Sequence, residues 1–153
     1  MEARQQQSRL PIHSVNKRAE NFRRVCSKLA KKNNKSPQHY SSLEMIVKKS
    51  LEKDLGLIEN LHYFHNARVS TINSNGRKVP FWVDFIIPTM NLVIEASPKM
   101  FHNLKRKVES DLRKKEYIIN NGFIFVALSE KEVESLKDMN IKLLLQEVIS
   151  RDG

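Results

Sequence analysis

Two apolar stretches joined by four residues decide the fold of this chain: FWVDFII at residues 81–87 and LVIEAS at residues 92–97, with PTMN between them. Each stretch has the length and the β-branched and aromatic content of a strand. Each also carries one acid near its centre, Asp84 in the first and Glu95 in the second. We therefore predict a β-hairpin whose loop is residues 88–91.

The length of this loop sets the register of the hairpin. If the loop is formed by residues 88–91, Ile87 faces Leu92 and paired positions sum to 179. Asp84 then lies opposite Glu95. Directly opposed side chains are about 5 Å apart at Cβ and share one face of the sheet. A register shifted by one residue would undo this pairing.

Two carboxylates this close in an apolar setting repel each other strongly. Either one of them stays protonated or a cation lies between them. Mg²⁺ or Mn²⁺ suits oxygen ligands, and such an ion activates water and stabilises charge on a phosphate that is being cut. We therefore predict that Asp84 and Glu95 bind a divalent metal ion. The alternative for each residue is an ordinary strand acid that faces solvent.

The rest of the sequence predicts an α/β domain around this hairpin. A helical repeat of apolar residues begins near residue 41 and ends before Gly56. Ser129 is expected to cap the helix that follows the last strand, with Glu132 completing a capping box. The other expected elements are extended structure at 61–72, a helix at 102–120, a strand at 123–128 and a helix at 141–149.

Positive charge is concentrated at the N-terminus. The chain has a formal net charge of +10, and residues 1–40 hold ten Lys or Arg against two acids. We expect residues 1–14 to form a disordered arm, followed by a short basic helix over 15–32. The charge balance favours a polyanionic partner, with nucleic acid ahead of an acidic membrane surface.

Cysteine content and hydropathy exclude several classes of protein. Cys26 is the single cysteine, so neither a disulfide framework nor a cysteine-based zinc site is expected. No apolar run approaches the roughly 20 residues of a membrane helix. No apolar stretch follows the basic N-terminus as it would in a secretory signal. We therefore expect an intracellular protein with no membrane partner.

The order of these features resembles the PD-(D/E)XK nucleases, in which a strand carries Asp and a second strand ends in Glu-x-Lys. The segments at 83–85 and 93–97 resemble that core, and Glu44 stands where an upstream helical Glu often completes the metal site. The downstream residues resemble the very-short-patch-repair endonucleases. The residues that carry this second likeness are His102, Asp111, Lys114, Tyr117 and Gly122-Phe123.

The resemblance covers about residues 40–130 and implies both a fold and an activity. The implied fold is α/β, a restriction-endonuclease-like core with a mixed central sheet flanked by helices. This endonuclease-like domain would occupy residues 41–153, after a basic N-terminal arm and helix at 1–40. The implied activity is metal-dependent hydrolysis of DNA phosphodiester bonds. The implied ligands of Mg²⁺ or Mn²⁺ are Asp84, Glu95 and Glu44.

One position departs from the family pattern. Ser97 stands where the motif lysine is expected beside the metal. The related branch with a downstream histidine often lacks that lysine, and the resemblance implies that His102 would then carry the proton. Lys99 and Lys105 are alternatives for the same role. The departure also leaves room for a member of the fold that binds nucleic acid without cutting it.

Several candidate residues also have purely structural explanations. Ser41 and Glu44 form a capping-box pattern that needs no catalytic function. His102 and Asp111 both fit an ordinary helix surface. Trp82, the only tryptophan, would wedge into DNA if it were exposed. We expect it instead to be buried under a packed helix.

His62 and His65 have the i,i+3 spacing of histidines that share one face of a helix. The residues around them, Leu61, Tyr63 and Phe64, favour extended structure instead, and no cysteine accompanies them. We therefore do not expect a metal site at this pair.

Basic residues near the N-terminus and in the helix after Glu95 are expected to contact DNA phosphates. The expected contacts are Arg18, Arg23, Arg24, Lys28, Lys31, Lys32, Lys105, Lys114 and Lys115. The substrate would be duplex DNA, with branched or mismatched duplexes included, and cutting both strands would be simplest for a homodimer. Two alternatives stay open: an inactive nucleic-acid-binding module of the same fold, and a subunit of a larger restriction or repair assembly that grips an acidic protein.

Overall fold

The computed structural model describes residues 20, 24, 39–72, 75–97 and 105–152. Glu20 and Arg24 are both helical and exposed, and they lie in the segment where a basic helix is predicted. The remainder of the predicted N-terminal arm and helix lies outside the described residues.

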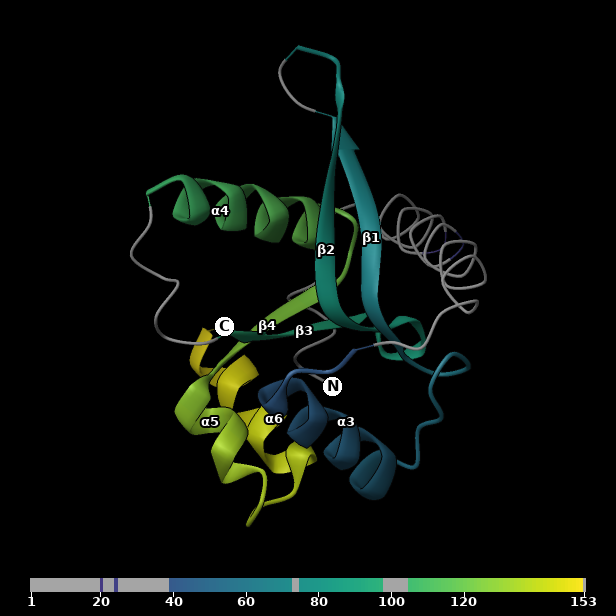
Figure 1. The fold of residues 1–153 in the computed structure, drawn as a ribbon, viewed down its shortest axis with the longest axis vertical. Helices are drawn as coiled ribbons and strands as arrows, with labels where there is room; N and C mark the ends of the chain where they lie inside the picture. The colour runs from purple at the N-terminus through teal and green to yellow at the C-terminus, as the bar shows by residue number, and fades with distance from the viewer. Residues whose placement is uncertain (1–19, 21–23, 25–38, 73–74, 98–104, 153) are drawn as a thin grey trace.

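Four strands form one mixed sheet in the order β1-β2-β3-β4. β1 (Phe64–Ile72), β2 (Lys78–Ile87) and β3 (Leu92–Ser97) are antiparallel neighbours, whereas β4 (Ile124–Ser129) runs parallel to β3. A parallel pair needs a crossover connection, and helix α4 (Lys105–Asn120) lies between β3 and β4 in the chain. The prediction of a mixed sheet flanked by helices is therefore confirmed (Figure 1).

The hairpin of β2 and β3 has the predicted register. Phe85 pairs with Ile94 and Ile87 pairs with Leu92, and both pairs sum to 179. A 3-10 turn connects the two strands, and Asn91 closes it with a φ of 49°. Asparagine tolerates this left-handed conformation better than most residues, which explains its place at the end of the turn.

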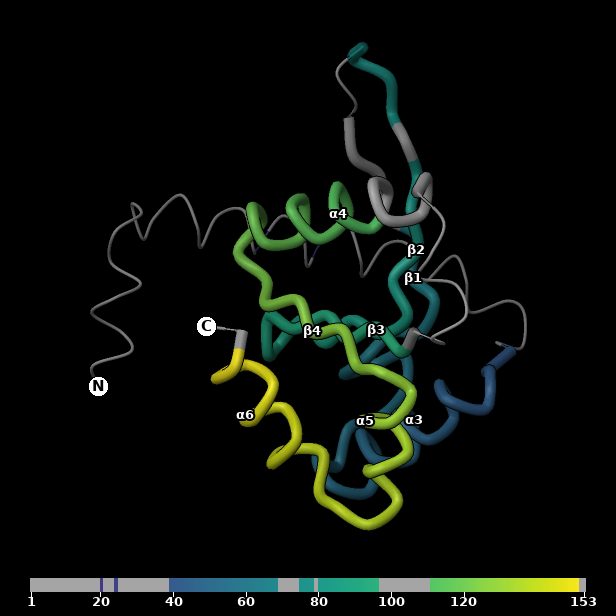
Figure 2. Tube along the Cα trace, turned by 90° about the vertical axis from the view of Figure 1, so that its left-hand side faces the viewer, coloured from purple at the N-terminus to yellow at the C-terminus, as the bar shows by residue number. Residues whose placement is uncertain are grey.

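Helices cover both faces of the sheet (Figures 1 and 2). α4 lies on one face, and α3 (Ser42–Leu55), α5 (Glu130–Ser135) and α6 (Ile141–Asp152) lie on the other. Within the described part of the chain, no helix is both long enough and apolar enough to cross a membrane. The arrangement is that of a three-layer α/β domain.

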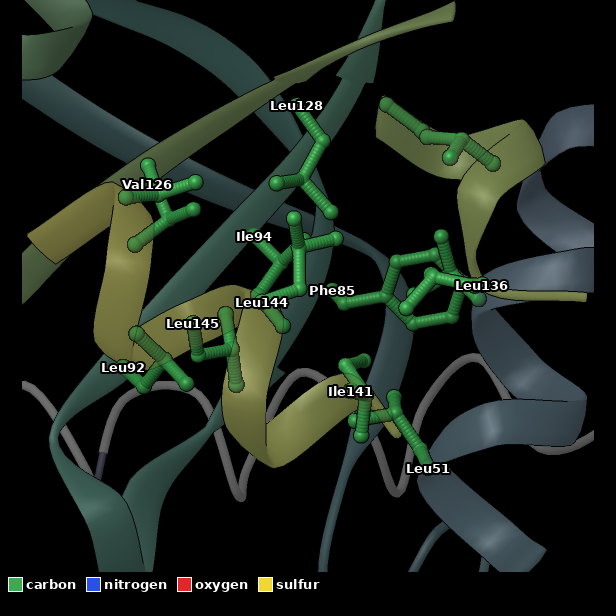
Figure 3. Close-up of a cluster of buried hydrophobic side chains, with 14 of the residues drawn as sticks. Leu51, Phe85, Leu92, Ile94, Val126, Leu128, Leu136, Ile141, Leu144 and Leu145 are labelled. Atoms are coloured by element: carbon green, nitrogen blue, oxygen red, sulfur yellow. The ribbon is translucent and has the colours of Figure 1, made fainter. Parts of the chain in front are cut away.

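Successive side chains of β3 point to opposite faces of the sheet and contribute to two hydrophobic cores. Ile94 belongs to the larger core, between the sheet and helices α3, α5 and α6, where it lies near Phe85 and Leu144 (Figure 3). Val93 points to the other face and belongs to a smaller core that includes Ile118 of α4. Glu95 has the same parity as Val93, so the strand geometry directs its side chain toward α4.

Local sequence signals fix the ends of the helices. Ser41 caps α3 in a reciprocal capping box with Glu44, and Gly56 ends this helix with a φ of 63°. Ser129 and Glu132 form the second capping box, at the start of α5, as predicted. Each box satisfies two backbone N–H groups that have no partner inside the helix.

β1 and β2 continue beyond the rest of the sheet as a hairpin arm, which we define as residues 66–72 and 75–83 (Figure 1). The side chains of β2 change their alternation where the arm meets the sheet. Val83 and Ile86 both pack in the α4 core, although three positions apart, whereas Phe85 packs in the core of the opposite face. In a regular strand, positions three apart point to opposite faces. The strand therefore turns over between Val83 and Phe85.

An unusual backbone conformation accompanies this change. In the register of β1 and β2, the residue that falls opposite Asp84 is Asn66, which has a φ of 51°. A positive φ lies far from the extended conformation of a strand and bends the ladder locally. Asp84 therefore lies at the junction between the arm and the sheet.

Candidate functional site

Asp84 and Glu95 lie beside each other on neighbouring strands. Asp84 of β2 is partly buried, and its Oδ2 accepts a hydrogen bond of 2.8 Å from the backbone N–H of Ala96 in β3. Glu95 is buried, with 6% of its surface exposed. The predicted neighbourhood of the two acids, which follows from the register, is present.

The environment of Glu95 disfavours its charged form. Burial raises the pKa of the Glu95 carboxyl, and the charge and hydrogen bond of Asp84 raise it further. The ammonium of Lys114 acts in the opposite direction, and the balance leaves the pKa at about 8. Near neutral pH the protein without a bound cation therefore keeps a proton on this pair of carboxyls.

Lys114 of α4 completes this cluster. Its Nζ lies 2.5 Å from Glu95 Oε1 and donates a hydrogen bond of 3.1 Å to the backbone carbonyl of Trp82. The two charged side chains are 15% and 8% exposed, so water screens the ion pair only weakly. We call Asp84, Glu95 and Lys114 the carboxylate–lysine cluster.

The geometry around Glu95 leaves one oxygen poorly satisfied. Glu95 Oε1 is buried and accepts no hydrogen bond of normal geometry within the described residues, although Lys114 Nζ is close. Lys114 is nevertheless the close partner of this oxygen, and its charge and hydrogen bond lower the pKa of Glu95. The ammonium group therefore occupies the space beside this oxygen, and a cation that bound to Oε1 would have to displace it.

The sequence assigned Lys114 to DNA phosphate contact and did not place it beside Glu95. One signal in the sequence does indicate its true position. Lys114 lies one helical turn before Ile118, which is fully buried against the sheet. Residues four apart share one face of a helix, so Lys114 points toward the strands. Its next neighbour Lys115 is exposed.

Glu44 belongs to a different cluster on the opposite face of the sheet, where α3 packs. Its Oε2 lies 2.6 Å from His65 Nε2, and the His65 side chain is only 1% exposed. The ring of Tyr40 stacks on that of His65 with centroids 3.8 Å apart. We call Tyr40, Glu44 and His65 the histidine cluster.

Glu44 is stabilised as an ion in this cluster. Burial alone would raise the pKa of its carboxyl, but hydrogen bonds with His65 and Ser41 outweigh burial and hold the pKa below its ordinary value. No group of three His, Cys, Asp or Glu side chains within the described residues is arranged to hold a metal ion. Glu44 is therefore not brought together with Asp84 and Glu95.

The other predicted site residues that the structure describes are dispersed. Asp111 is partly buried on α4, and Arg24 and Lys115 are exposed. Lys105 begins α4, but its side chain is not among those described. His62 accepts a hydrogen bond at Nδ1 from the backbone of Ile58 and has no contact with the carboxylates. Predicted residues outside the described part of the chain are Arg18, Arg23, Lys28, Lys31, Lys32, Lys99 and His102.

Trp82 contradicts its prediction. It is 51% exposed, not buried under a helix. The residue that packs on α4 is its neighbour Phe81, whose ring meets that of Tyr117 edge to face at 5.6 Å. The prediction assumed that side chains alternate regularly along β2 from the sheet to Trp82. The strand instead turns over next to Asp84, so the prediction of burial was wrong.

One open cavity of about 510 Å³ lies between α3 and the segment joining α5 to α6. Ser50, Lys53, Asp54 and Met139 are among the residues that line it. None of the residues of the carboxylate–lysine cluster lines this cavity.

The chain was compared with protein-family models, with curated proteins and with solved structures, and no match was found in any of the three comparisons.

Proposed function

We propose that the chain is a metal-dependent endonuclease that hydrolyses DNA phosphodiester bonds, with a restriction-endonuclease-like core. The observation that carries this proposal is the meeting of Asp84 and Glu95 on adjacent strands, with Lys114 beside them. The formal net charge of +10 supports a polyanionic substrate.

The two carboxylates suit a divalent cation. Burial, followed by the charge of Asp84, raises the pKa of Glu95 to about 8, and a cation between the two acids would reduce the repulsion between them. Mg²⁺ is usually held by one or two protein carboxylates together with water and substrate phosphate. Asp84 and Glu95 would therefore hold Mg²⁺ or Mn²⁺ without Glu44. When bound, such an ion lowers the pKa of water and neutralises charge on the phosphate.

Lys114 supports the proposal because it supplies the ammonium group that Ser97 does not. Its Nζ is 2.5 Å from a Glu95 oxygen and is held in place by the carbonyl of Trp82. An ammonium beside the carboxylates would stabilise the negative charge that develops on the phosphate oxygens. We therefore assign to Lys114 the role that the motif lysine has in the family that the sequence resembles.

The backbone of β3 would orient the first acid. The N–H of Ala96 donates to Asp84 Oδ2, which fixes the rotamer of this carboxylate relative to Glu95. A ligand held in this way needs little reorganisation when a cation binds. His102 remains the proposed proton carrier, and the basic residues of the N-terminal segment remain proposed phosphate contacts.

One observation favours a second candidate function, an inactive nucleic-acid-binding module. The ammonium of Lys114 already offsets charge at Glu95 without a metal ion. In that case the cluster would be a structural ion pair, and cleavage would be absent while DNA binding persisted.

A cleavage assay separates the two candidates. Plasmid, branched and mismatched duplexes are incubated in Mg²⁺ and in Mn²⁺ with the wild-type protein and with Asp84→Asn. We expect wild-type cleavage to fall by roughly 100-fold or more in the variant, because a bound metal contributes several kcal/mol to the stabilisation of the transition state. Glu116→Gln removes an exposed acid from α4 and serves as the control. DNA binding without cleavage by the wild type supports the inactive module.

Lysine variants test the assignment of Lys114. Lys114→Met should lower the cleavage rate, whereas Lys115→Met, at the exposed neighbouring position, should change only the affinity and its salt dependence. If both substitutions weaken affinity equally and leave the rate constant at saturation unchanged, Lys114 is a phosphate contact and has no role in the chemical step.

A further inference from the structure

The arm carries an exposed aromatic ring where the sequence predicts burial. Trp82 is the only tryptophan of the chain and is 51% exposed, although β2 offers apolar cores on both of its faces. Its neighbours Phe81 and Val83 pack toward α4. An exposed indole of this size leaves a large apolar surface in water and is a common feature of binding sites.

A guanidinium group lies over part of this ring. Arg68 of β1 is the cross-strand partner of Trp82, and its Cζ lies 5.8 Å from the centroid of the indole. Arg68 is itself exposed. The two side chains therefore form one exposed aromatic and cationic surface.

The charge of the arm indicates which class of ligand this surface would bind. Residues 66–83 contain three basic residues, Arg68, Arg77 and Lys78, and no Asp or Glu. An aromatic ring among cations suits nucleic acid, because the ring stacks on a base while the cations attract the backbone phosphates.

The surface is connected to the carboxylate–lysine cluster through the backbone. The carbonyl of Trp82 accepts the hydrogen bond of Lys114, the residue that contacts Glu95. Asp84 lies two residues further along β2, a distance of about 7 Å in an extended chain. Because Phe81 and Val83 pack toward α4, the ring of Trp82 points to the other side of the strand, so the backbone of β2 is what joins the ring to the cluster.

We propose that Arg68 and Trp82 form a stacking site for an unpaired base of the nucleic acid that the cluster acts on. This inference rests on the proposed function, and it narrows the substrate to DNA that has at least one unstacked base within reach of the arm. A fully paired duplex keeps its bases inside the stack and would have to be distorted to use the site.

Tryptophan fluorescence tests the proposal directly, because all of the signal comes from Trp82. The wild-type protein is titrated in EDTA with a single-stranded oligonucleotide, a fully paired duplex, and the same duplex with one unpaired base. We expect quenching by the single strand and by the duplex with the unpaired base, and weak quenching by the paired duplex. Absence of quenching by every oligonucleotide, or equal quenching by the two duplexes, overturns the proposal.

Affinity measurements with labelled oligonucleotides test the energetic contribution of the ring. Trp82→Ala should weaken binding of the single strand by roughly 5- to 150-fold, the range for loss of one base–aromatic stack. Trp82→Phe should recover part of this loss. The control is Leu112→Ala, which removes another exposed apolar side chain from α4. An unchanged affinity in Trp82→Ala, or a loss equal to that of the control, overturns the proposal.

The failure of this proposal is distinguishable from the failure of the proposed function. Asp84→Asn should keep the fluorescence response while losing cleavage. If the wild-type protein shows the fluorescence response but does not cut DNA, the proposed stacking site stands and only the proposed enzymatic activity is wrong. If the wild-type protein cuts paired duplex DNA without a change in fluorescence, the proposed activity stands and the proposed stacking site is wrong.

Discussion

The carboxylate–lysine cluster and the histidine cluster contain similar groups but treat their carboxylates in opposite ways. Glu95 lies beside Lys114, but burial and the charge of Asp84 raise its pKa to about 8. Glu44 accepts hydrogen bonds from Ser41 and His65, and its pKa is lowered. The fold therefore disfavours charge on one acid and favours it on the other. Such imbalance is more typical of a functional site than of a structural contact.

The largest expected effect that separates the two clusters is on cleavage. Glu95→Gln should lower the rate of DNA hydrolysis by roughly 100-fold or more, because it removes a proposed metal ligand. Glu44→Gln should change the rate far less, because Glu44 lies on the other face of the sheet. The measurement is the single-turnover rate with saturating protein in Mg²⁺. A larger loss in Glu44→Gln than in Glu95→Gln would exchange the roles of the two clusters.

The next effect concerns stability as a function of pH in EDTA. The pKa of Glu95 in the folded protein, about 8, lies above its ordinary value of 4.5. Between these values the folded state holds a proton that the unfolded state has lost, so stability should decrease as pH rises from about 4.5 to 8. The full penalty, on the order of a few kcal/mol, remains above pH 8.

Urea denaturation of wild type and Glu95→Gln between pH 5 and 9 measures this penalty. The variant should be the more stable protein at pH 9, and the difference should shrink toward pH 5. A constant difference across this range would show that Glu95 does not titrate with a raised pKa.

The histidine cluster should show the opposite sign. Glu44→Gln should lower the free energy of unfolding at pH 7 by about 1 to 3 kcal/mol, because a buried charged hydrogen bond to His65 is lost. Since the pKa of Glu44 is lowered by folding, its contribution is present above pH 4.5 and is lost as pH falls through the lower value. The exposed control Glu116→Gln should stay within about 0.5 kcal/mol of the wild type.

The smallest expected effect is stabilisation by metal. Addition of Mn²⁺ at about five times its Kd should stabilise the wild type by about 1 kcal/mol, measured as a shift in Tm. Asp84→Asn should lose this shift and Glu44→Gln should keep it. A shift that survives in Asp84→Asn but disappears in Glu44→Gln would move the metal site to the histidine cluster.

The closeness of the two strand acids could be predicted because it depends on local sequence. A four-residue turn that ends in Asn91 sets the register, and the register sets which side chains meet. The capping boxes of Ser41 and Ser129 were predictable for the same reason. Signals of this kind are complete within about ten residues of chain and do not depend on distant packing.

The residues that the sequence misplaced depend on contacts between distant segments. Lys114 meets Glu95 only because α4 crosses over β3, and Glu44 meets His65 across 21 positions of sequence. Trp82 is exposed because β2 turns over beside Asp84, and this turn depends on the conformation of another strand. Periodicity within one strand cannot report such a change, since it assumes a constant alternation.

The positive φ of Asn66 forms a backbone joint between the arm and the sheet, and this joint affects the orientation of both the arm and the acid pair. On one side of the joint the strands carry the ring and the cations of the arm, and on the other side they carry the paired acids. A valine or isoleucine at this position would favour an extended conformation and straighten the joint. The orientation of Trp82 and that of Asp84 would then change together, so a substitution that redirects the arm would also disturb the acid pair.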